Sequence, residues 1–167
     1  MHPFAAPKAL RITKEVPEMV SQYSAAMCNH PDGQTDALTH GVWMALLTRQ
    51  IGERKAVSLG QAHERQNRRT ARRNYKRNRP SHHDAAAMEM DLFNNRQGAE
   101  TARTVSAPDS LLPGIIAEEV LNGKFRVVRH DAAGNFLDES GNIIGFEDWG
   151  YLWKNSRVLV TSDKAGR

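Results

Sequence analysis

The densest group of residues capable of chemistry lies in the segment 65–79, where eight of the fifteen side chains are Arg or Lys and none is acidic. Seven of the eight are arginines, whose planar guanidinium groups bind phosphate through paired hydrogen bonds and stack on bases. At spacings of three and four, a helix would place six of the basic side chains in one stripe: Arg65, Arg68, Arg69, Arg72, Arg73 and Lys76. Like charges repel at that spacing, so the stripe indicates a polyanionic partner, and nucleic acid is the commonest one.

We therefore expect this segment to bind nucleic acid, with RNA slightly favoured over DNA. Interleaved amides such as Asn67 and Asn74 can hydrogen-bond base edges, and Tyr75 can stack on an unpaired base. The expected nucleic-acid-binding residues are Arg65, Arg68, Arg69, Arg72, Arg73, Tyr75, Lys76, Arg77 and Arg79, together with Lys124 and Arg126 further along the chain.

Lys124 and Arg126 alternate with Phe125 and Val127 in a segment that reads as a strand, so the two basic side chains share one face with His130. That face extends the basic surface if it lies near residues 65–79. The same alternation is typical of any half-exposed strand, and we favour this simpler interpretation.

The segment resembles the arginine-rich motif of phage antitermination proteins and some viral RNA-binding regulators. The resemblance implies a helix that binds inside the widened groove of an RNA hairpin. It rests on composition and covers only the basic segment of a 167-residue chain, so it assigns no family. A basic zipper is excluded because Pro80 follows and no leucine heptads do. The competing interpretation is a solvated charged linker or a run like those that direct nuclear import.

Two groups of residues have the types that bind metals, but neither has the spacing. The first group is Cys28 and His30 with His40, and the second is His82-His83-Asp84. These spacings match no usual zinc site, and no HExxH or paired CxxC is present. We therefore expect no metal and no cofactor.

The adjacent acid–base pairs are poor candidates for catalysis. They are His130-Asp131, Glu118-Glu119 and Glu147-Asp148. Neighbouring side chains on a strand point to opposite faces, so such a pair does not converge on one substrate atom. The chain also lacks a P-loop, a nucleophile elbow and a dinucleotide-binding loop. We expect no catalytic residues, no enzymatic activity and no small-molecule substrate.

The net charge of +4 conceals three different parts. Residues 1–50 carry four basic and four acidic side chains, residues 51–81 ten and two, and residues 82–167 nine and thirteen. We expect the acidic C-terminal part to bind a protein partner. A single cysteine excludes an internal disulfide, and neither a membrane-spanning run nor a secretory signal is visible, which indicates a cytoplasmic location.

The pattern of elements predicts an α+β protein: an N-terminal helical part with an arginine-rich helix or disordered segment, followed by a small C-terminal antiparallel β-meander. We expect a flexible arm at 1–16, a helical domain at 17–97 that includes the basic segment 61–79, a linker at 98–113, a small sheet domain at 114–162 and a tail at 163–167. Helices are expected at 17–28, opened by Pro17, at 35–51, ended by Gly52, and at 82–97, capped by Ser81. A break is expected at 58–60.

Two assignments stay open. The basic segment has almost no apolar residues, so it is either a helix or a disordered segment that folds on its ligand. Residues 110–122 are either the first strand of a hairpin that turns at Asn122-Gly123, or a helix that Gly123 ends. In the sheet, the large side chains expected to fill the core are Trp149, Tyr151, Leu152 and Trp153.

Together these patterns indicate a non-enzymatic regulatory or accessory protein that docks on nucleic acid, as part of a larger transcription or translation complex. One alternative is an inhibitor or adaptor whose arginine run occupies an acidic protein cleft. The other is a small nucleic-acid-processing enzyme, whose metal-dependent cleavage would be lost on changing His82 or His83 to Ala.

Overall fold

The computed structural model of the chain describes residues 5–166. It contains α1 (Ala5–Ser21), α2 (Gln34–Ile51), α3 (Glu53–Tyr75), α4 (Ala85–Thr104), α5 (Leu112–Leu121), β1 (Arg126–Val128), α6 (Phe146–Trp149) and β2 (Leu159–Thr161). Short 3-10 turns lie at Ser24–Ala26, Asp109–Leu111 and Ser162–Lys164. This order of helices followed by a small antiparallel sheet confirms the α+β prediction. Residues 1–4 of the expected arm and residue 167 of the expected tail lie outside the described residues.

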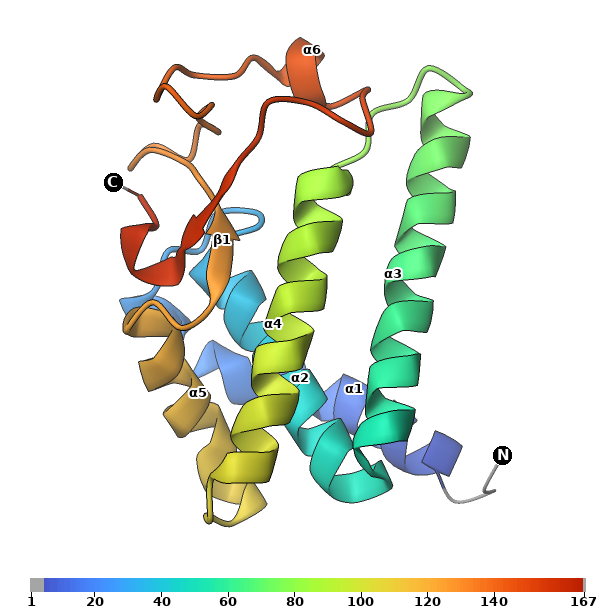
Figure 1. The fold of residues 1–167 in the computed structure, drawn as a ribbon, viewed down its shortest axis with the longest axis vertical. Coiled ribbons are helices and arrows are strands. Elements are labelled where there is room, and N and C mark those ends of the chain that lie inside the picture. Colours follow the sequence, from blue (N-terminus) through green and yellow to red (C-terminus); the bar gives the residue numbers. More distant parts are fainter. Residues whose placement is uncertain (1–4, 167) are drawn as a thin grey trace.

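Helix α2 lies at the centre of the molecule and packs against α1, α3, α4 and α5 (Figure 1). Its apolar side chains are buried on several sides, among them Leu38, Val42 and Leu47, because neighbours surround it. The expected helix at 35–51 is confirmed. Gly52 ends it, with a φ of +88° that glycine adopts readily.

Helices α2 and α4 touch through two glycines. A Cβ placed on Gly98 would lie 2.8 Å from the Cα of Gly41 and would also overlap the carbonyl oxygen of Gly41. A Cβ on Gly41 would lie 2.7 Å from the ring of Phe125. The missing side chain of Gly98 therefore lets the two backbones come into contact, and that of Gly41 makes room for Phe125.

Helix α3 carries the basic segment and lies beside α4 (Figure 1). It runs unbroken from Glu53, so the predicted break at 58–60 is wrong, because Gly60 is buried where α3 packs on its neighbours. The buried residues of α3 are Ala56, Gly60, Glu64 and Ala71, small residues apart from one carboxylate. Of the two alternatives for the basic segment, the structure has the helix.

The prediction of a flexible arm is wrong for residues 5–16. Helix α1 begins at Ala5, and its residues Ile12, Val16 and Val20 recur every four positions and are buried in the core. Pro17 lies inside this helix instead of opening it. Packing of this apolar face against the core stabilises the helix. The prolines in this part of the sequence gave no indication of it.

The predicted linker at 98–113 is also wrong. Helix α4 begins at Ala85 and continues to Thr104, with Ala99 and Ala102 buried, and α5 follows after a short turn. Asp84, and not Ser81, caps α4 by accepting a hydrogen bond from the amide of Ala87. The guanidinium of one arginine of α2 satisfies carbonyls in the last turn of α4 and just after it: Arg49 donates to Ala102, Val105 and Ala107.

The C-terminal part has less sheet than the predicted β-meander, since its described residues form a single two-stranded sheet. Residues 112–121 form α5, and Gly123, with a φ of +81°, follows the end of this helix, so the helical alternative for 110–122 is correct and the hairpin is not. Strands β1 and β2 pair antiparallel, with Val127 opposite Val160. Phe125 and Val127 belong to the core of α2, so this part shares its core with the helices.

A second apolar cluster covers the other end of α4. Its buried members are Met90, Val128, Phe136, Ile144 and Trp149. Among the four large side chains expected in the sheet core, only Trp149 is buried; Leu152 is exposed, and Tyr151 and Trp153 are half-buried. The prediction is wrong for these three because the segment crosses the ends of the helices instead of forming a strand.

None of the helices within residues 5–166 is both long and apolar enough to cross a lipid bilayer.

The contact between α2 and α4 predicts that Gly98→Ala lowers the free energy of unfolding by about 1–3 kcal/mol, because the added methyl group meets backbone that cannot move aside. The measurement is urea denaturation. Gly60→Ala is the matched control, since its Cβ would meet side-chain atoms of Asn95 and Met44, at 3.2 and 3.4 Å, and no backbone. The control should be neutral or more stable by up to about 1 kcal/mol, from helix propensity. Equal effects of both changes would contradict the proposed backbone contact.

Candidate functional site

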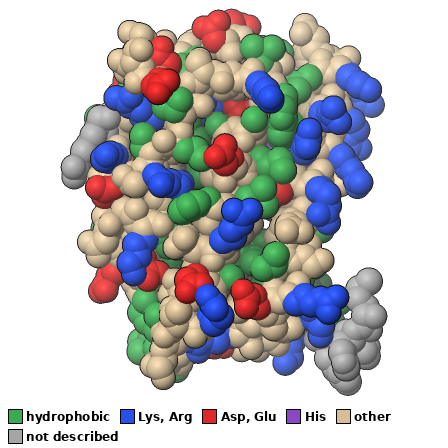
Figure 2. All heavy atoms as spheres, in the orientation of Figure 1, with side chains coloured by type: hydrophobic (Ala, Val, Ile, Leu, Met, Phe, Trp, Pro, Cys, Tyr) green, Lys and Arg blue, Asp and Glu red, His purple; other side chains and the backbone are tan. Residues whose placement is uncertain are grey.

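The outer surface of α3 and the loop after it form what we call the basic face: Arg65, Arg68, Arg69, Arg72, Arg73, Lys76, Arg77 and Arg79. All eight side chains are exposed, and the basic residues follow the length of α3 (Figure 2). Among the residues that the structure describes, none of these eight forms an ion pair with a carboxylate. The face therefore keeps its positive charge available for an external anion.

A groove beside the basic face combines arginines with aromatic rings. It has a volume of about 540 Å³ between α3, α4 and the sheet, and its arginines are Arg68, Arg96 and Arg126. The guanidinium of Arg68 lies 5.2 Å from the ring centroid of Trp153, and that of Arg126 lies 5.3 Å from the ring of Phe93. Apolar side chains gather beside basic ones on this face (Figure 2). Such a surface suits a ligand with both phosphates and bases.

The remaining predicted binding residues are placed differently. Arg126 lines the groove, as just described, whereas the ammonium group of Lys124 lies 2.7 Å from a carboxylate oxygen of Glu119. The hydroxyl of Tyr75 donates toward the carbonyls of His83 and Leu152, at 3.3 Å each, so it holds the segments next to α3. Phe125 and Val127 are buried as expected, but His130 is also buried and does not share the exposed face.

Beneath the basic face lies a group of five side chains, the acid–histidine centre: Asp36 and His40 of α2, Glu64 of α3, His83 of the loop 76–84, and Asp91 of α4. His40 Nε2 lies 3.2 Å from Asp91 Oδ1 and 4.0 Å from Asp36 Oδ1. His83 Nε2 lies 3.4 Å from Glu64 Oε2, and its Nδ1 lies 3.8 Å from Asp91 Oδ2. Three helices and a loop thus bring these groups together.

The inner part of the centre is buried and electrostatically strained, whereas the side chain of Asp36 at its edge is 38% exposed. Glu64 is fully buried and Asp91 is 4% exposed. Burial raises the pKa of Asp91 well above its usual range, and the charges of Asp36 and Glu64 raise it further. Burial also lowers the pKa of His83 to about 4, so this imidazole is neutral at pH 7. The centre therefore joins an acid that resists ionisation to a base that resists protonation.

Arg157 fixes the loop that carries His83. Its side chain is fully buried, lies 2.6 Å from a carboxylate oxygen of Asp84 and 2.6 Å from one of Asp32, and donates to the carbonyl of His82. Asp84 in turn caps α4. Burial raises the pKa of Asp32 to about 6 although the guanidinium lies beside it. Arg157, from the C-terminal part of the chain, thus connects the start of α4 to the loop before it.

The predicted metal-ligand groups are divided by the structure. Cys28 Sγ lies 2.9 Å from His130 Nε2, and His130 Nδ1 donates to the carbonyl of Val128, while His30 only packs its ring edge-on against His130. The ring of His82 packs near Trp149. Of the two sequence groups, only His40 and His83 enter the acid–histidine centre.

Sequence reasoning missed the three carboxylates of the centre. Asp36 and His40 are one helical turn apart, and Glu64 is the single charged residue on the buried face of α3, at the same spacing as Ala56 and Gly60. This spacing can be recognised only when the buried face of α3 is known, because the exposed basic residues dominate the composition of the helix.

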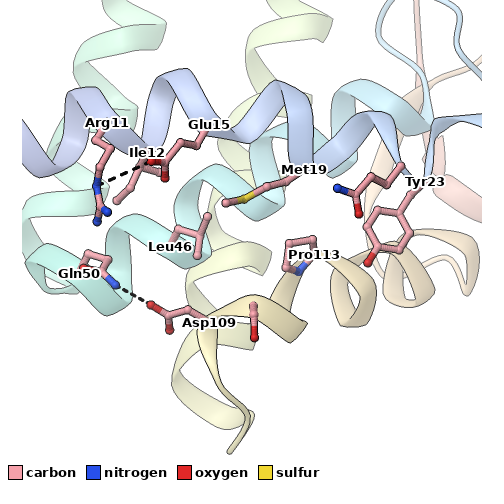
Figure 3. Close-up of a pocket in the computed structure, with 11 residues that line it drawn as sticks. Arg11, Ile12, Glu15, Met19, Tyr23, Leu46, Gln50, Asp109 and Pro113 are labelled. Carbon is pink, nitrogen blue, oxygen red and sulfur yellow. Dashed lines mark hydrogen bonds and ion pairs between the residues drawn. The ribbon is translucent and has the colours of Figure 1, made fainter.

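A separate hollow of about 360 Å³ lies between α1, the end of α2 and the segment 109–113 (Figure 3). Its charged groups already have partners within the protein: Arg11 faces Glu15, and Asp109 accepts from Gln50 and lies 3.5 Å from Arg49. It is therefore a weaker candidate for a binding site than the groove beside α3.

A family described as Domain of unknown function (DUF6973) matches residues 1–124, a range that includes all of α1 to α5 and every member of the acid–histidine centre. Arg126, Trp153 and Arg157 lie beyond it. No curated protein and no solved structure matches the chain.

The position of Arg157 predicts that Arg157→Met lowers the free energy of unfolding by about 3–5 kcal/mol, because two buried carboxylates lose their counter-charge. Arg129→Met is the control, since Arg129 only donates to the carbonyls of Asp138 and Glu139, and it should cost about 1 kcal/mol. Guanidinium denaturation measures both. A loss for Arg157→Met no larger than that of the control would contradict this role.

Proposed function

The chain belongs to the DUF6973 family, and from its own side chains we propose that it is a nucleic-acid-binding regulatory or accessory protein. The observation that carries the proposal is the basic face, where eight exposed cations lie without carboxylate partners among the described residues. Confining like charges to one surface is unfavourable unless a polyanion binds there. The proposal includes a cytoplasmic location and RNA, slightly ahead of DNA, as the ligand.

The groove supports a single-stranded ligand. Arg68 belongs to both the basic face and the groove, so a phosphate backbone that follows α3 would bring its bases toward Trp153 and Phe93. Stacking on an aromatic ring contributes about 1–3 kcal/mol for each base. The carboxylate of Glu89 also lines the groove and would accept a base amino group.

We also propose that the acidic C-terminal part binds a protein partner. Asp131 and Asp138 hold their own turns, since both accept hydrogen bonds from residues up to four positions on, and these bonds lower the pKa of each. The carboxylates available to a partner are therefore the exposed ones nearby: Glu139, Glu147 and Asp148.

Neutralising about six phosphates predicts that affinity falls with salt at a log–log slope of about −5. Fluorescence anisotropy with a labelled single-stranded RNA and a duplex DNA measures this slope. The triple variant R69Q/R72Q/R73Q should reduce its magnitude by about 3, since each lost contact removes about 0.9.

The matched control is K8Q/R11Q/K14Q, which removes the same charge from the exposed surface of α1 and should leave the slope nearly unchanged. Equal losses in both triple variants would contradict a specific role for the basic face. If heparin binds but no nucleic acid does, the basic face occupies an acidic protein cleft instead, and the adaptor alternative replaces the proposal.

A second candidate function, a small nucleic-acid-processing enzyme, is favoured by one observation. The acid–histidine centre adjoins the groove, because the ring of His83 lies 6.4 Å from that of Trp153, over which Arg68 stacks. Carboxylates and imidazoles can supply general acid–base groups or metal ligands for hydrolysis of a phosphodiester.

This candidate predicts cleavage of labelled RNA or DNA in the presence of Mn²⁺, abolished by EDTA. H83Q should lower the rate about 100-fold or more, since it removes a group that takes part in the chemistry. H82Q should retain the rate, because His82 packs on aromatic rings outside the centre. Cleavage that survives H83Q would exclude the centre as its source.

A further inference from the structure

The acid–histidine centre consists of two triads that share one residue. Asp36, His40 and Asp91 form the first, and Glu64, His83 and Asp91 form the second; within each, the potential ligand atoms lie within 4.8 Å of one another. The five residues come from α2, α3, α4 and the loop before α4. Their convergence is a product of tertiary packing, and it brings three carboxylates into one small volume.

Two carboxylate oxygens at the centre lack hydrogen-bond donors. Glu64 Oε1 and Asp91 Oδ1 are buried atoms without a hydrogen-bond partner, although both residues are more than nine-tenths buried. The imidazole nitrogens nearby do not satisfy them, because His83 Nε2 has no hydrogen-bond partner either. A buried carboxylate oxygen without a donor is costly, and a cation held by Glu64 and Asp91 would replace the missing donors.

Each of the two histidines directs a ring nitrogen toward the carboxylates of the centre. With the amide oriented as it is, Asn95 Oδ1 accepts a hydrogen bond from His40 Nδ1 at 3.1 Å, which leaves a lone pair on Nε2 facing Asp91. Metal-bound histidines usually donate their second N–H to such an acceptor. His83 sits among buried groups on a loop that Arg157 and Asp84 hold, so its ring is also positioned in advance.

From this geometry we propose that the acid–histidine centre is a binding site for a divalent transition-metal ion, with Asp91 as the shared ligand. Two imidazoles and three carboxylates form a mixed nitrogen and oxygen donor set, which suits Zn²⁺, Mn²⁺ or Fe²⁺ better than the all-oxygen sites of Ca²⁺. Cys28 takes no part, since its sulfur is engaged with His130. The site is independent of the basic face, so the proposal stands whether or not the protein binds nucleic acid.

The test is isothermal titration of the full-length protein, treated with EDTA and dialysed, with ZnCl₂ and separately with MnCl₂. The absorption spectrum of added Co²⁺ reports on the ligands directly. Wild-type protein should bind Zn²⁺, gain thermal stability from it, and give a Co²⁺ spectrum of nitrogen and oxygen ligands without a thiolate band. D91N should bind the metal at least about tenfold more weakly than wild-type protein. Mutation of a residue that only supports a metal ligand usually costs about tenfold or more, and the loss of a ligand should cost no less.

E64Q provides a second variant in case D91N does not fold, and it should weaken binding in the same direction. H82Q is the matched control, because it removes the neighbouring imidazole and leaves the centre intact. Metal-free D91N and E64Q should unfold at the wild-type temperature or above it, since each keeps the size of the side chain and replaces one of two neighbouring buried carboxyl groups by a neutral amide. Failure of wild-type protein to bind any of the three ions, or undiminished binding by both D91N and E64Q, would overturn the proposal.

Discussion

The contact between α2 and α4 at Gly41 and Gly98 is the constraint on which the rest of the structure depends. His40 precedes Gly41, and Asp91 and Asn95 lie on α4 within two turns of Gly98, so the contact of the backbones sets the separation of their side chains. With side chains at the crossing, the helices would stand further apart. The ring of His40 would then not come within 3.1 Å of Asn95 Oδ1 and 3.2 Å of Asp91 Oδ1.

Helix α3 has two chemically different faces. Its inner face consists of small residues that allow close packing, with Glu64 as the only buried charge, while its outer face carries the arginines. An isolated helix of this composition would be marginal, because it buries little apolar surface and its like charges repel. Close packing against α2 and α4 stabilises it in the folded protein. The same contact places a carboxylate of α3 beside groups from the other helices.

The residues after α5 support the helices more than they form a separate unit. Phe125 and Val127 enter the core of α2, and Asn94 of α4 exchanges two hydrogen bonds with the backbone of Arg126. Further along the chain, Arg157 forms an ion pair with Asp84 at the start of α4. The C-terminal part therefore positions both the groove and the loop of His83, although the family match ends before it.

The sequence by itself determined the α+β class, the central helix ended by Gly52 and the positions of the exposed arginines. These features depend on local spacing and on the cost of burying charge, which composition and periodicity express directly. It did not determine α1 or the second half of α4, where Ile12, Ala99 and Ala102 become buried only through contacts with α2 and its neighbours. The acid–histidine centre was decided by tertiary structure alone. Its members lie far apart along the chain, and only the packing of three helices makes Asp36, Glu64 and Asp91 neighbours.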